Sequence, residues 1–375
     1  MKFALFYEIP VARPWSAASE HEAFKNTLEQ AVLGDRMGFD SFWTVEHHFL
    51  EEFSHCSNPE VLYGAVAART QRMRIGYGVR LGPRPYNHPV RSAESAAVLD
   101  LISDGRVEFG TGRSSTRLEM EGFGIHPNET RGMWEEALRH IVTCWTEDEA
   151  EFEGRYWKLP RRRVLPKPLQ RPHPPIWGAT GSSDGHRMMG ELGLGLLSFS
   201  VGTPPEELKQ RIDLYRAGIA ACRQPLGAFV NDRAACFTLV NVAPTQAESY
   251  ALARDSFPWY AQRSAELVSS VPLWLEEMKA EGDGTYDYLK AAQDAVRERL
   301  HELATLDALL GMNAVLAGDP DEVVERCRAY VATGADLLLC LVNPYRIPHE
   351  KVMQTIELMG RHVIPEFSRD GGGIR

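Results

Sequence analysis

The chain has 375 residues, of which 44% are hydrophobic and 25% charged, and its formal net charge at pH 7 is −10. This is the composition of a globular protein with a sizeable apolar core, and it excludes an intrinsically disordered chain. The acidic excess argues against nucleic acid as a partner, because binding to phosphate backbones requires clustered lysine and arginine. A small-molecule partner is therefore favoured.

The first ten residues, MKFALFYEIP, have one lysine and an apolar run too short for a signal peptide. No later window approaches the roughly 20 apolar residues that a membrane span requires. The six cysteines are scattered singly without a C-x-x-C pair, which argues against a disulfide framework and a zinc site. We expect a cytoplasmic protein without a metal centre.

Eight short apolar runs recur along the chain, separated by amphipathic stretches. The runs are KFALFYE, SFWTVE, MRIGYGVRL, RVEFGTG, PPIWGAT, LGLLSFS, AACFTLVNVA and ADLLLCLVN. Eight strands alternating with helices predict an α/β fold, a (β/α)8 barrel of the TIM type. We expect a single domain over residues 1–368, followed by a flexible glycine-rich tail over 369–375.

Helix boundaries can be predicted near both ends of the chain. Ser19 and Glu22 form a capping-box pattern at the start of a helix that is expected to end near Gly34. Asp319 can cap another helix, with Pro320 at its first position.

Two intervals between the predicted strands are too long for simple loops. They span about residues 111–174 and 249–316. In a barrel of this kind the active site forms at the carboxyl ends of the strands, from the segments that follow them. We therefore expect both intervals to be insertions on this catalytic face.

The motif EHHF places His47 and His48 at the carboxyl end of the second strand. Side chains at that position of a barrel point into the site. One imidazole could be a neutral hydrogen-bond partner or a general base at cellular pH. A metal site with Glu46 and His55 or His88 is an alternative, although adjacent side chains on extended backbone point to opposite faces. A structural role, with each imidazole bonded to backbone or a loop, is the other alternative.

A second candidate site is the turn after the fifth strand, within IWGATGSSDGH. The chain passes through Gly181, Ser182, Ser183 and Gly185 into a helix, so backbone N–H groups and two hydroxyls gather at a helix N-terminus. Such a turn is suited to an anion, and best to a phosphate. It is neither a dinucleotide-binding motif nor a P-loop, and a purely local role for glycine and serine in the turn is the alternative.

Arg113 follows the glycine-flanked end of the fourth strand, where a guanidinium group can bind a phosphate through two hydrogen bonds. A surface arginine in a turn is the alternative. Gly76, Gly78 and Gly82 lie in and just after the third strand. Because glycines weaken a strand unless another backbone or a flat ligand approaches closely, a planar ring against this strand would explain them.

Together these segments resemble the bacterial luciferase-like flavin monooxygenase family, in particular its alkanal monooxygenase branch. The resemblance covers nearly the whole chain, in order and spacing, through MKF, GFDSFWTVEHHF, SNPEVL, HPVRSAESAAVLDLISDGRVEFGTGR, PPIWGATGSSDG and GDPDEVVERCRAYVATGADLLLCLV. It implies a TIM-type barrel that binds reduced FMN (FMNH2) and oxygenates a small organic substrate with O2 through a flavin C4a-(hydro)peroxide. It also implies a separate flavin reductase and a homodimer, in which the helix EVLYGAVAART could form part of the interface.

The resemblance also implies roles for individual residues. His47 matches the family's catalytic histidine, with His48 as its neighbour. Arg113 matches the arginine that binds the flavin phosphate. Gly78 and Val79 match a non-proline cis peptide bond that lies against the flavin ring. The family's phosphate loop corresponds to five residues, Ala179, Thr180, Gly181, Ser182 and Ser183.

Two positions depart from the light-emitting members of the family. Gly112 replaces a reactive cysteine, and Thr180 replaces an acidic residue of the phosphate loop, so light emission from a long-chain aldehyde is not expected. A deazaflavin-dependent dehydrogenase on the same barrel and a non-catalytic partner subunit remain alternative functions. A metal hydrolase is a weaker alternative, because the first strand lacks an H-x-H motif. An apolar substrate pocket could involve five aromatic residues, Trp15, Phe53, Trp259, Tyr260 and Trp274, and packing in the core or in loops is the alternative for them.

Overall fold

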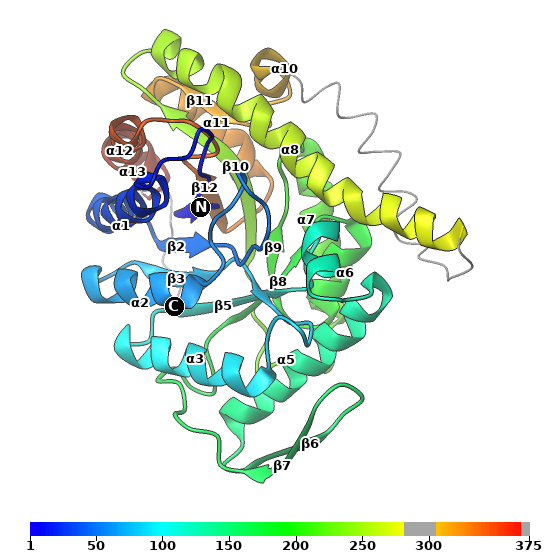
Figure 1. Ribbon diagram of the computed structural model, residues 1–375. Helices are drawn as coiled ribbons and strands as arrows, with labels where there is room; N and C mark the ends of the chain where they lie inside the picture. Colours follow the sequence, from blue (N-terminus) through cyan, green and yellow to red (C-terminus); the bar gives the residue numbers. More distant parts are fainter. Residues whose placement is uncertain (281–304, 369–375) are drawn as a thin grey trace.

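The computed structural model of the protein describes residues 1–280 and 305–368. Eight parallel strands form a closed barrel surrounded by helices, and the pairing of the last of these strands with the first completes the ring (Figure 1). The barrel strands are β1 (Lys2–Tyr7), β2 (Ser41–Thr44), β3 (Arg74–Tyr77), β5 (Val107–Gly112), β8 (Ile176–Thr180), β9 (Gly195–Ser198), β10 (Ala234–Val242) and β12 (Leu337–Leu341). Each predicted apolar run contains one of them, so the predicted barrel is confirmed.

Four further strands accompany the barrel. β4 (Arg80–Leu81) continues from β3 along β5, and β11 (Leu316–Gly318) pairs with the end of β10. β6 (Ala150–Glu153) and β7 (Lys158–Arg162) form an antiparallel hairpin that extends away from the barrel (Figure 1). The sequence did not predict β11, because three residues are too few to show a strand pattern.

The helices follow the strands and cover the outside of the barrel. They are α1 (Ser19–Met37), α2 (Pro59–Arg69), α3 (Pro89–Ile102), α4 (Arg117–Gly122), η1 (Pro127–Glu129), α5 (Thr130–Thr146), α6 (Ser183–Glu191), α7 (Pro205–Ala221), α8 (Gln246–Ala280), α10 (Leu306–Gly311), α11 (Pro320–Ala332), α12 (His349–Leu358), η2 (Met359–Val363) and α13 (Ile364–Ser368). Over the described ranges, no helix combines the length and the apolar character needed to cross a bilayer.

The two predicted helix starts behave differently. Asp319 caps α11 as expected, since its side chain accepts a hydrogen bond from the backbone N–H of Glu322 at 3.0 Å. The capping box at Ser19 is wrong: α1 begins there, but the cap position falls one residue earlier and has no side-chain hydrogen bond. α1 also continues past Gly34 and ends at Met37.

The two long intervals contribute to the face formed by the carboxyl ends of the strands, here called the barrel mouth. α4 from the first interval and α8 from the second pack against each other there. The first interval also contains α5, which packs against α3 on the outside of the barrel. Residues 281–304 and the predicted tail, 369–375, lie outside the described residues.

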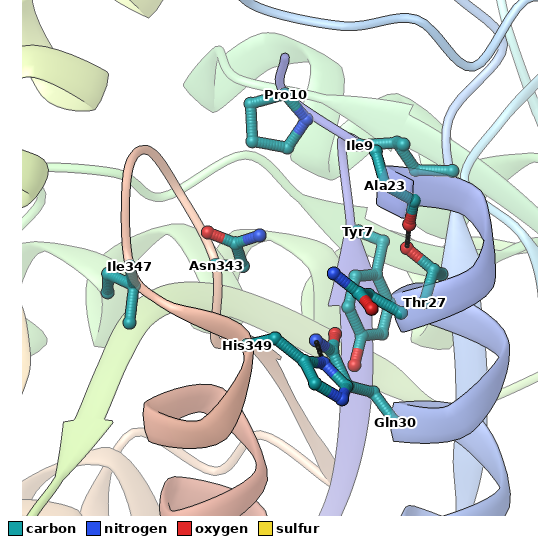
Figure 2. Close-up of a pocket in the computed structure, with 10 residues that line it drawn as sticks. Tyr7, Ile9, Pro10, Ala23, Thr27, Gln30, Asn343, Ile347 and His349 are labelled. Carbon is teal, nitrogen blue, oxygen red and sulfur yellow. Dashed lines mark hydrogen bonds between the residues drawn. The ribbon is translucent and has the colours of Figure 1, made fainter. Parts of the chain in front are cut away.

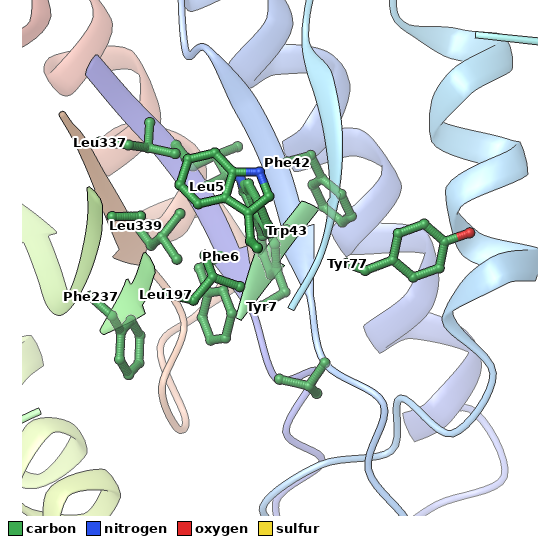
Figure 3. Close-up of a cluster of buried hydrophobic side chains, with 14 of the residues drawn as sticks. Leu5, Phe6, Tyr7, Phe42, Trp43, Tyr77, Leu197, Phe237, Leu337 and Leu339 are labelled. Atoms are coloured by element: carbon green, nitrogen blue, oxygen red, sulfur yellow. The ribbon is translucent and has the colours of Figure 1, made fainter. Parts of the chain in front are cut away.

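Large side chains fill the barrel interior. Figure 3 shows Phe6, Leu197, Phe237 and Leu339 converging from four different strands. The rings of Phe6 and Phe237 are 4.8 Å apart, and both side chains are at least nine-tenths buried. The interior is therefore a packed core rather than a channel.

Indole rings of the protein explain two of the three glycines around the third strand. A Cβ atom at Gly76 would lie 2.1 Å from the indole of Trp43, and one at Gly82 would lie 3.0 Å from the indole of Trp134. The prediction that a flat ligand accounts for these glycines is wrong at both positions, because tryptophan side chains already occupy the space.

The amino-terminal end of the barrel is closed around Glu108, whose side chain is buried. Its carboxylate accepts hydrogen bonds from Arg74 Nε at 2.5 Å, Arg233 Nη2 at 2.7 Å and Trp177 Nε1 at 2.7 Å. Both oxygens of this carboxylate are thus bonded, and its charge is balanced by the two guanidinium groups.

Candidate active site

His47 lies at the barrel mouth, three residues beyond the end of β2. Its backbone N–H donates to the carbonyl of Cys56 at 2.9 Å, which folds the following loop back on itself. The same loop is attached to the end of β1, because the hydroxyl of Ser54 donates to the carbonyl of Glu8 at 2.7 Å. These backbone contacts bring the imidazole of His47 next to the side chain of Glu8.

Two buried carboxylates flank the imidazole of His47. Its Nδ1 donates to Glu119 Oε1 at 2.9 Å, and its Nε2 lies 3.6 Å from Glu8 Oε2. The hydroxyl of Tyr260, from α8, donates to the other oxygen of Glu8 at 2.8 Å. Glu8 Oε2 itself has no hydrogen-bond partner within the described part of the chain. We call these four residues the His47 cluster.

The carboxylates determine the charge of the imidazole. Burial alone would lower the pKa of His47, but the charges of Glu119, Glu8 and Glu46 outweigh it and raise this pKa to about 9. Burial also raises the pKa of Glu8 above its usual value, whereas for Glu119 the effect of burial is exceeded by His47 and by hydroxyl and backbone donors, so its pKa is lowered. At neutral pH His47 is therefore a cation, not the neutral base considered from the sequence.

His48 points to a different environment. Its ring stacks on Tyr86, with centroids 5.9 Å apart, and meets the edge of Phe123 at 4.9 Å. Its backbone N–H donates to Glu119 Oε1 at 3.1 Å. The two adjacent imidazoles thus point to different neighbours, as expected for extended backbone: that of His47 joins Glu8 and Glu119, and that of His48 joins the aromatic rings, with its Nε2 3.8 Å from Glu46 Oε1.

The histidines considered as further metal ligands have other partners. His55 Nδ1 lies 2.8 Å from Glu20 Oε1 on α1, and the side chain of His88 caps α3 by accepting from the N–H of Val90. Among the described residues, no group of three or more His, Cys, Asp or Glu side chains could hold a metal ion.

Three members of the His47 cluster were not predicted as site residues. Glu8 directly follows β1, so the rule that strand ends carry functional residues could have identified it. Glu119 matches the capping-box pattern that begins at Thr116, which bonds to both its N–H and its carboxylate, and the pattern alone indicates only a helix start. Tyr260 was considered only as a pocket residue, and nothing in its local sequence indicates its contact with Glu8.

The register of the sheet brings Arg113 next to the predicted phosphate loop. β5 and β8 are neighbours, with Thr111 opposite Gly178. Two residues further along, Arg113 therefore leaves β5 alongside Thr180 at the end of β8, at a strand spacing of about 5 Å. Both residues are half-buried at the barrel mouth.

The loop itself has the geometry of an anion site. Ser182 caps α6, its hydroxyl accepting from the N–H of Gly185 at 3.1 Å, while its own N–H donates to the hydroxyl of Thr180 at 3.3 Å. Helix geometry leaves the first N–H groups of α6, those of Ser183 and Asp184, without intrahelical acceptors. These donors point out of the helix end, where its dipole favours a negative charge.

The peptide bond between Gly78 and Val79 is cis, as the resemblance implied. This bond lies between β3 and β4, next to the end of β5: a Cβ atom at Gly112 would lie 2.7 Å from Val79 Cγ2. The cis peptide, Arg113 and the loop at Thr180 thus follow one another across neighbouring strands of the barrel mouth.

Of the five aromatic residues considered for a pocket, three come together. Phe53 stacks on Tyr260 at 5.1 Å and on Trp259 at 6.3 Å, and it also meets the ring of His47 edge-on at 6.3 Å. The other two lie elsewhere, with Trp15 against His55 and Trp274 near the guanidinium of Arg117.

A small, partly open cavity of about 50 Å³ lies outside the barrel wall, between β1, α1 and the segment leading into α12 (Figure 2). Figure 2 shows Tyr7, Gln30 and His349 directed toward one another around it. A volume of this size accommodates a few water molecules and excludes a flavin. The cavity is therefore distinct from the barrel mouth and is not the cofactor site.

Comparison with known proteins assigns the chain to a family. The sequence model of the family described as luciferase-like monooxygenase matches residues 1–337. The chain belongs to this family. It is accordingly an oxidoreductase of the flavin-dependent monooxygenase class.

Relatives of the luciferase-like family match over most or part of the chain. The oxygenase component of the flavin-dependent trigonelline monooxygenase of Acinetobacter baylyi is 25% identical, covering 98% of this chain and 96% of that protein. The alkanal monooxygenase alpha chain of Photorhabdus luminescens is 29% identical over 52% of this chain and 53% of its own length. The oxygenating constituent of 3,6-diketocamphane monooxygenase from Pseudomonas putida, solved in complex with FMN, superimposes with a TM-score of 0.74 at 25% identity and covers 98% of both chains.

Proposed function

We propose that this luciferase-like protein binds reduced FMN and uses O2 to oxygenate a small organic substrate. The observation that carries the proposal is that the His47 cluster, the half-buried Gly78–Val79 segment after β3 and the loop beside Arg113 occupy the same end of one barrel. One flavin nucleotide at this end would then have a group for acid–base chemistry, a surface for its ring and a site for its phosphate.

The donors at the barrel mouth fit a flavin mononucleotide. Arg113, the hydroxyls of Thr180, Ser182 and Ser183, and the N–H groups at the start of α6 would hold the phosphate. Ala179 and Gly181 supply the backbone of this loop, and the half-buried Gly78–Val79 segment would face the ring system. The guanidinium of Arg113 after β5 and the amino-terminal dipole of α6 after β8 match a dianionic phosphate better than a neutral ligand.

Reduced FMN, when bound, supplies the electrons that activate O2. His47 would stabilise negative charge that develops beside its imidazolium and can donate a proton from Nε2. Glu119 orients the ring through Nδ1, and Tyr260 holds Glu8 in place beside Nε2. The stacked rings of Phe53 and its neighbours would exclude water from this space.

His48 has a supporting role in this proposal. It packs against both Tyr86 and Phe123, and its backbone N–H helps to fix Glu119. We therefore retain His47 as the residue that acts on the reacting groups and treat His48 as one that positions its partner.

Two other functions remain alternatives to this proposal. A deazaflavin-dependent dehydrogenase would use the same barrel without O2, and the FMN complex of the diketocamphane relative favours FMN. A non-catalytic partner subunit would not need a complete His47 cluster, whereas this chain contains one. Turnover by the purified single chain separates the partner-subunit alternative from the enzyme.

The deciding experiment mixes the protein with photoreduced FMN without oxygen, admits air and follows the flavin absorbance. We expect tight binding of reduced FMN and a reoxidation course different from that of free FMN. The same titration with a reduced deazaflavin serves as the comparison. Preferential binding of the deazaflavin, or reoxidation identical to that of free FMN, would contradict the proposal.

We further propose a homodimer supplied with flavin by a separate reductase. The name of the trigonelline relative, an oxygenase component, supports a separate reductase. Exposed aliphatic side chains on the adjacent helices α2 and α3 support a dimer contact there: Val61, Val98, Leu101 and Ile102. The single domain over residues 1–368 also remains a proposal, and the substrate is left as a small organic molecule because relatives act on different ones.

A further inference from the structure

The proposed phosphate loop rests on a buried histidine that the site described above does not use. His186 lies in the first turn of α6 and is fully buried. Its Nδ1 is 2.7 Å from the carbonyl oxygen of Ser182, and its Nε2 is 2.8 Å from the hydroxyl of Ser198. Since a carbonyl oxygen can only accept, Nδ1 carries the proton, and Nε2 accepts from the serine hydroxyl.

These two contacts connect the loop to the neighbouring strand. Ser182 is the cap residue of α6, and Ser198 is the last residue of β9, directly opposite Thr180 in the sheet. The carbonyl of Ser182 receives two hydrogen bonds from His186, one from the imidazole and one from the backbone N–H at 3.0 Å. The imidazole therefore fixes the start of the helix relative to the ends of both β8 and β9.

We propose that His186 is a positioning residue, which holds the loop 180–185 in the geometry that binds the flavin phosphate. This inference rests on the proposed function, because it assigns to one side chain the alignment of the phosphate donors. Gly181 and Ser183 are exposed, so the loop has little packing of its own to keep its N–H groups aligned. An anchor beneath it lowers the conformational entropy lost on binding.

The protonation state of His186 suits this role. Burial lowers the pKa of its imidazole to about 4, so the ring is neutral at neutral pH and keeps its acceptor for Ser198. His186 therefore does not supply a second positive charge for the phosphate. Its contribution is geometric, unlike that of Arg113.

The other interpretation is that His186 is only a satisfied core histidine, and His173 provides a matched control for it. His173 is also buried, with Nδ1 2.8 Å from the carbonyl of Pro174 and Nε2 accepting from the N–H of Ala228 at 2.9 Å. Burial lowers the pKa of His173 as well. It precedes β8, at the opposite end of the strand from the phosphate loop.

The test compares anaerobic dissociation constants for reduced FMN and reduced riboflavin, which differ only in the phosphate. The wild-type protein should bind FMN more tightly than riboflavin. His186→Gln, which keeps a polar group near Ser198 but loses the Nδ1 donor, should reduce this preference by about tenfold, the equivalent of one well-placed hydrogen bond. His186→Asn retains a donor at the position of Nδ1 and should recover part of the preference, while His173→Asn should leave it unchanged.

Ser198→Ala removes the other contact without altering the histidine, and it provides a second variant if a substitution at His186 impairs folding. We expect a smaller decrease in the FMN preference, with riboflavin affinity unaffected. A preference equal to wild type in the folded variants would overturn the role of His186, as would an equal loss in His173→Asn. If the wild-type protein does not distinguish the two flavins, the phosphate assignment of the proposed function fails first, and the inference fails with it.

Discussion

Glu108 and Glu8 are buried carboxylates at opposite ends of the same barrel, and their surroundings differ. Glu108, at the amino-terminal end, accepts hydrogen bonds from two arginines and a tryptophan. Glu8, at the barrel mouth, accepts one hydrogen bond from Tyr260, and its second oxygen lies 3.6 Å from the imidazole of His47. The amino-terminal end thus pairs both oxygens of Glu108, whereas the mouth leaves one oxygen of Glu8 without a hydrogen bond in the described part of the chain.

This difference indicates that the end around Glu108 contributes to stability, whereas the end around Glu8 is suited to chemistry. A buried charge with all its partners holds its surroundings rigidly, and removing one partner is costly. A buried carboxylate with an unpaired oxygen perturbs its neighbours instead, and here it helps to raise the pKa of His47 to about 9. The division agrees with the general pattern of such barrels, in which the amino-terminal face serves stability and the carboxyl-terminal face carries the site.

The largest effect is expected from His47→Ala. Loss of the imidazolium should reduce kcat for substrate oxygenation by about 10²–10⁴-fold, the usual contribution of a positioned acid or base. The thermal unfolding midpoint should fall as well, because the buried carboxylate of Glu119 loses its imidazolium partner, so the kinetics are measured at a temperature at which the variant is folded. Steady-state kinetics with an excess of reduced FMN provide the measurement, and oxygenation at the wild-type rate would remove the assigned role.

A second pair of variants compares the two ends directly. Glu108→Gln should lower the free energy of unfolding by about 2–3 kcal/mol, less than for a fully enclosed ion pair, because both arginines partly reach solvent. Glu8→Gln, which has the same shape, should change it by less than about 1 kcal/mol, since its charge is incompletely paired. Urea denaturation measures both values, and equal losses would refute the division between the ends.

A smaller effect concerns the dependence of stability on pH. The pKa of His47 is about 9 in the folded protein, against about 6.5 in an unfolded chain. The stability that this shift contributes is fully present below pH 6.5 and is lost as the pH rises through about 9. Glu119→Gln should lower the folded pKa and thereby shrink this alkaline loss.

Denaturation curves at pH 6, 7.5 and 9.5, for the wild type and for Glu119→Gln, test this expectation, with His47→Gln as the reference that lacks the titrating group. The imidazole pKa can be followed in parallel by NMR. An unchanged imidazole pKa in Glu119→Gln would contradict the assignment of Glu119 as the main partner of His47.

Local features of the sequence were sufficient to predict the barrel and the glycine- and serine-containing turn that precedes α6. Apolar runs of a few residues identified each barrel strand. The loop at Gly181 is continuous in the chain, so its N–H and hydroxyl groups lie close together wherever a strand precedes the loop and a helix follows it. The cap at Asp319 was also predicted, because its pattern spans only a few residues. The similar pattern at Ser19 did not form a cap, since the hydroxyl of Ser19 accepts from the backbone N–H of Ser16 instead. Resemblance to the family, rather than any local pattern, indicated the cis bond at Gly78.

The sequence by itself thus determined the fold class, the strand order along the chain and the turn before α6 that we propose as the phosphate site. Only the tertiary structure decided which side chains surround His47. Its partner Glu119 is 72 positions away in the sequence, and Glu8 and Tyr260, which bond to each other, are 252 positions apart. Patterns of burial and capping act over a few residues, whereas contacts between distant side chains depend on how strands align around the barrel. The charge of His47 follows from those contacts, and it was therefore decided by the fold.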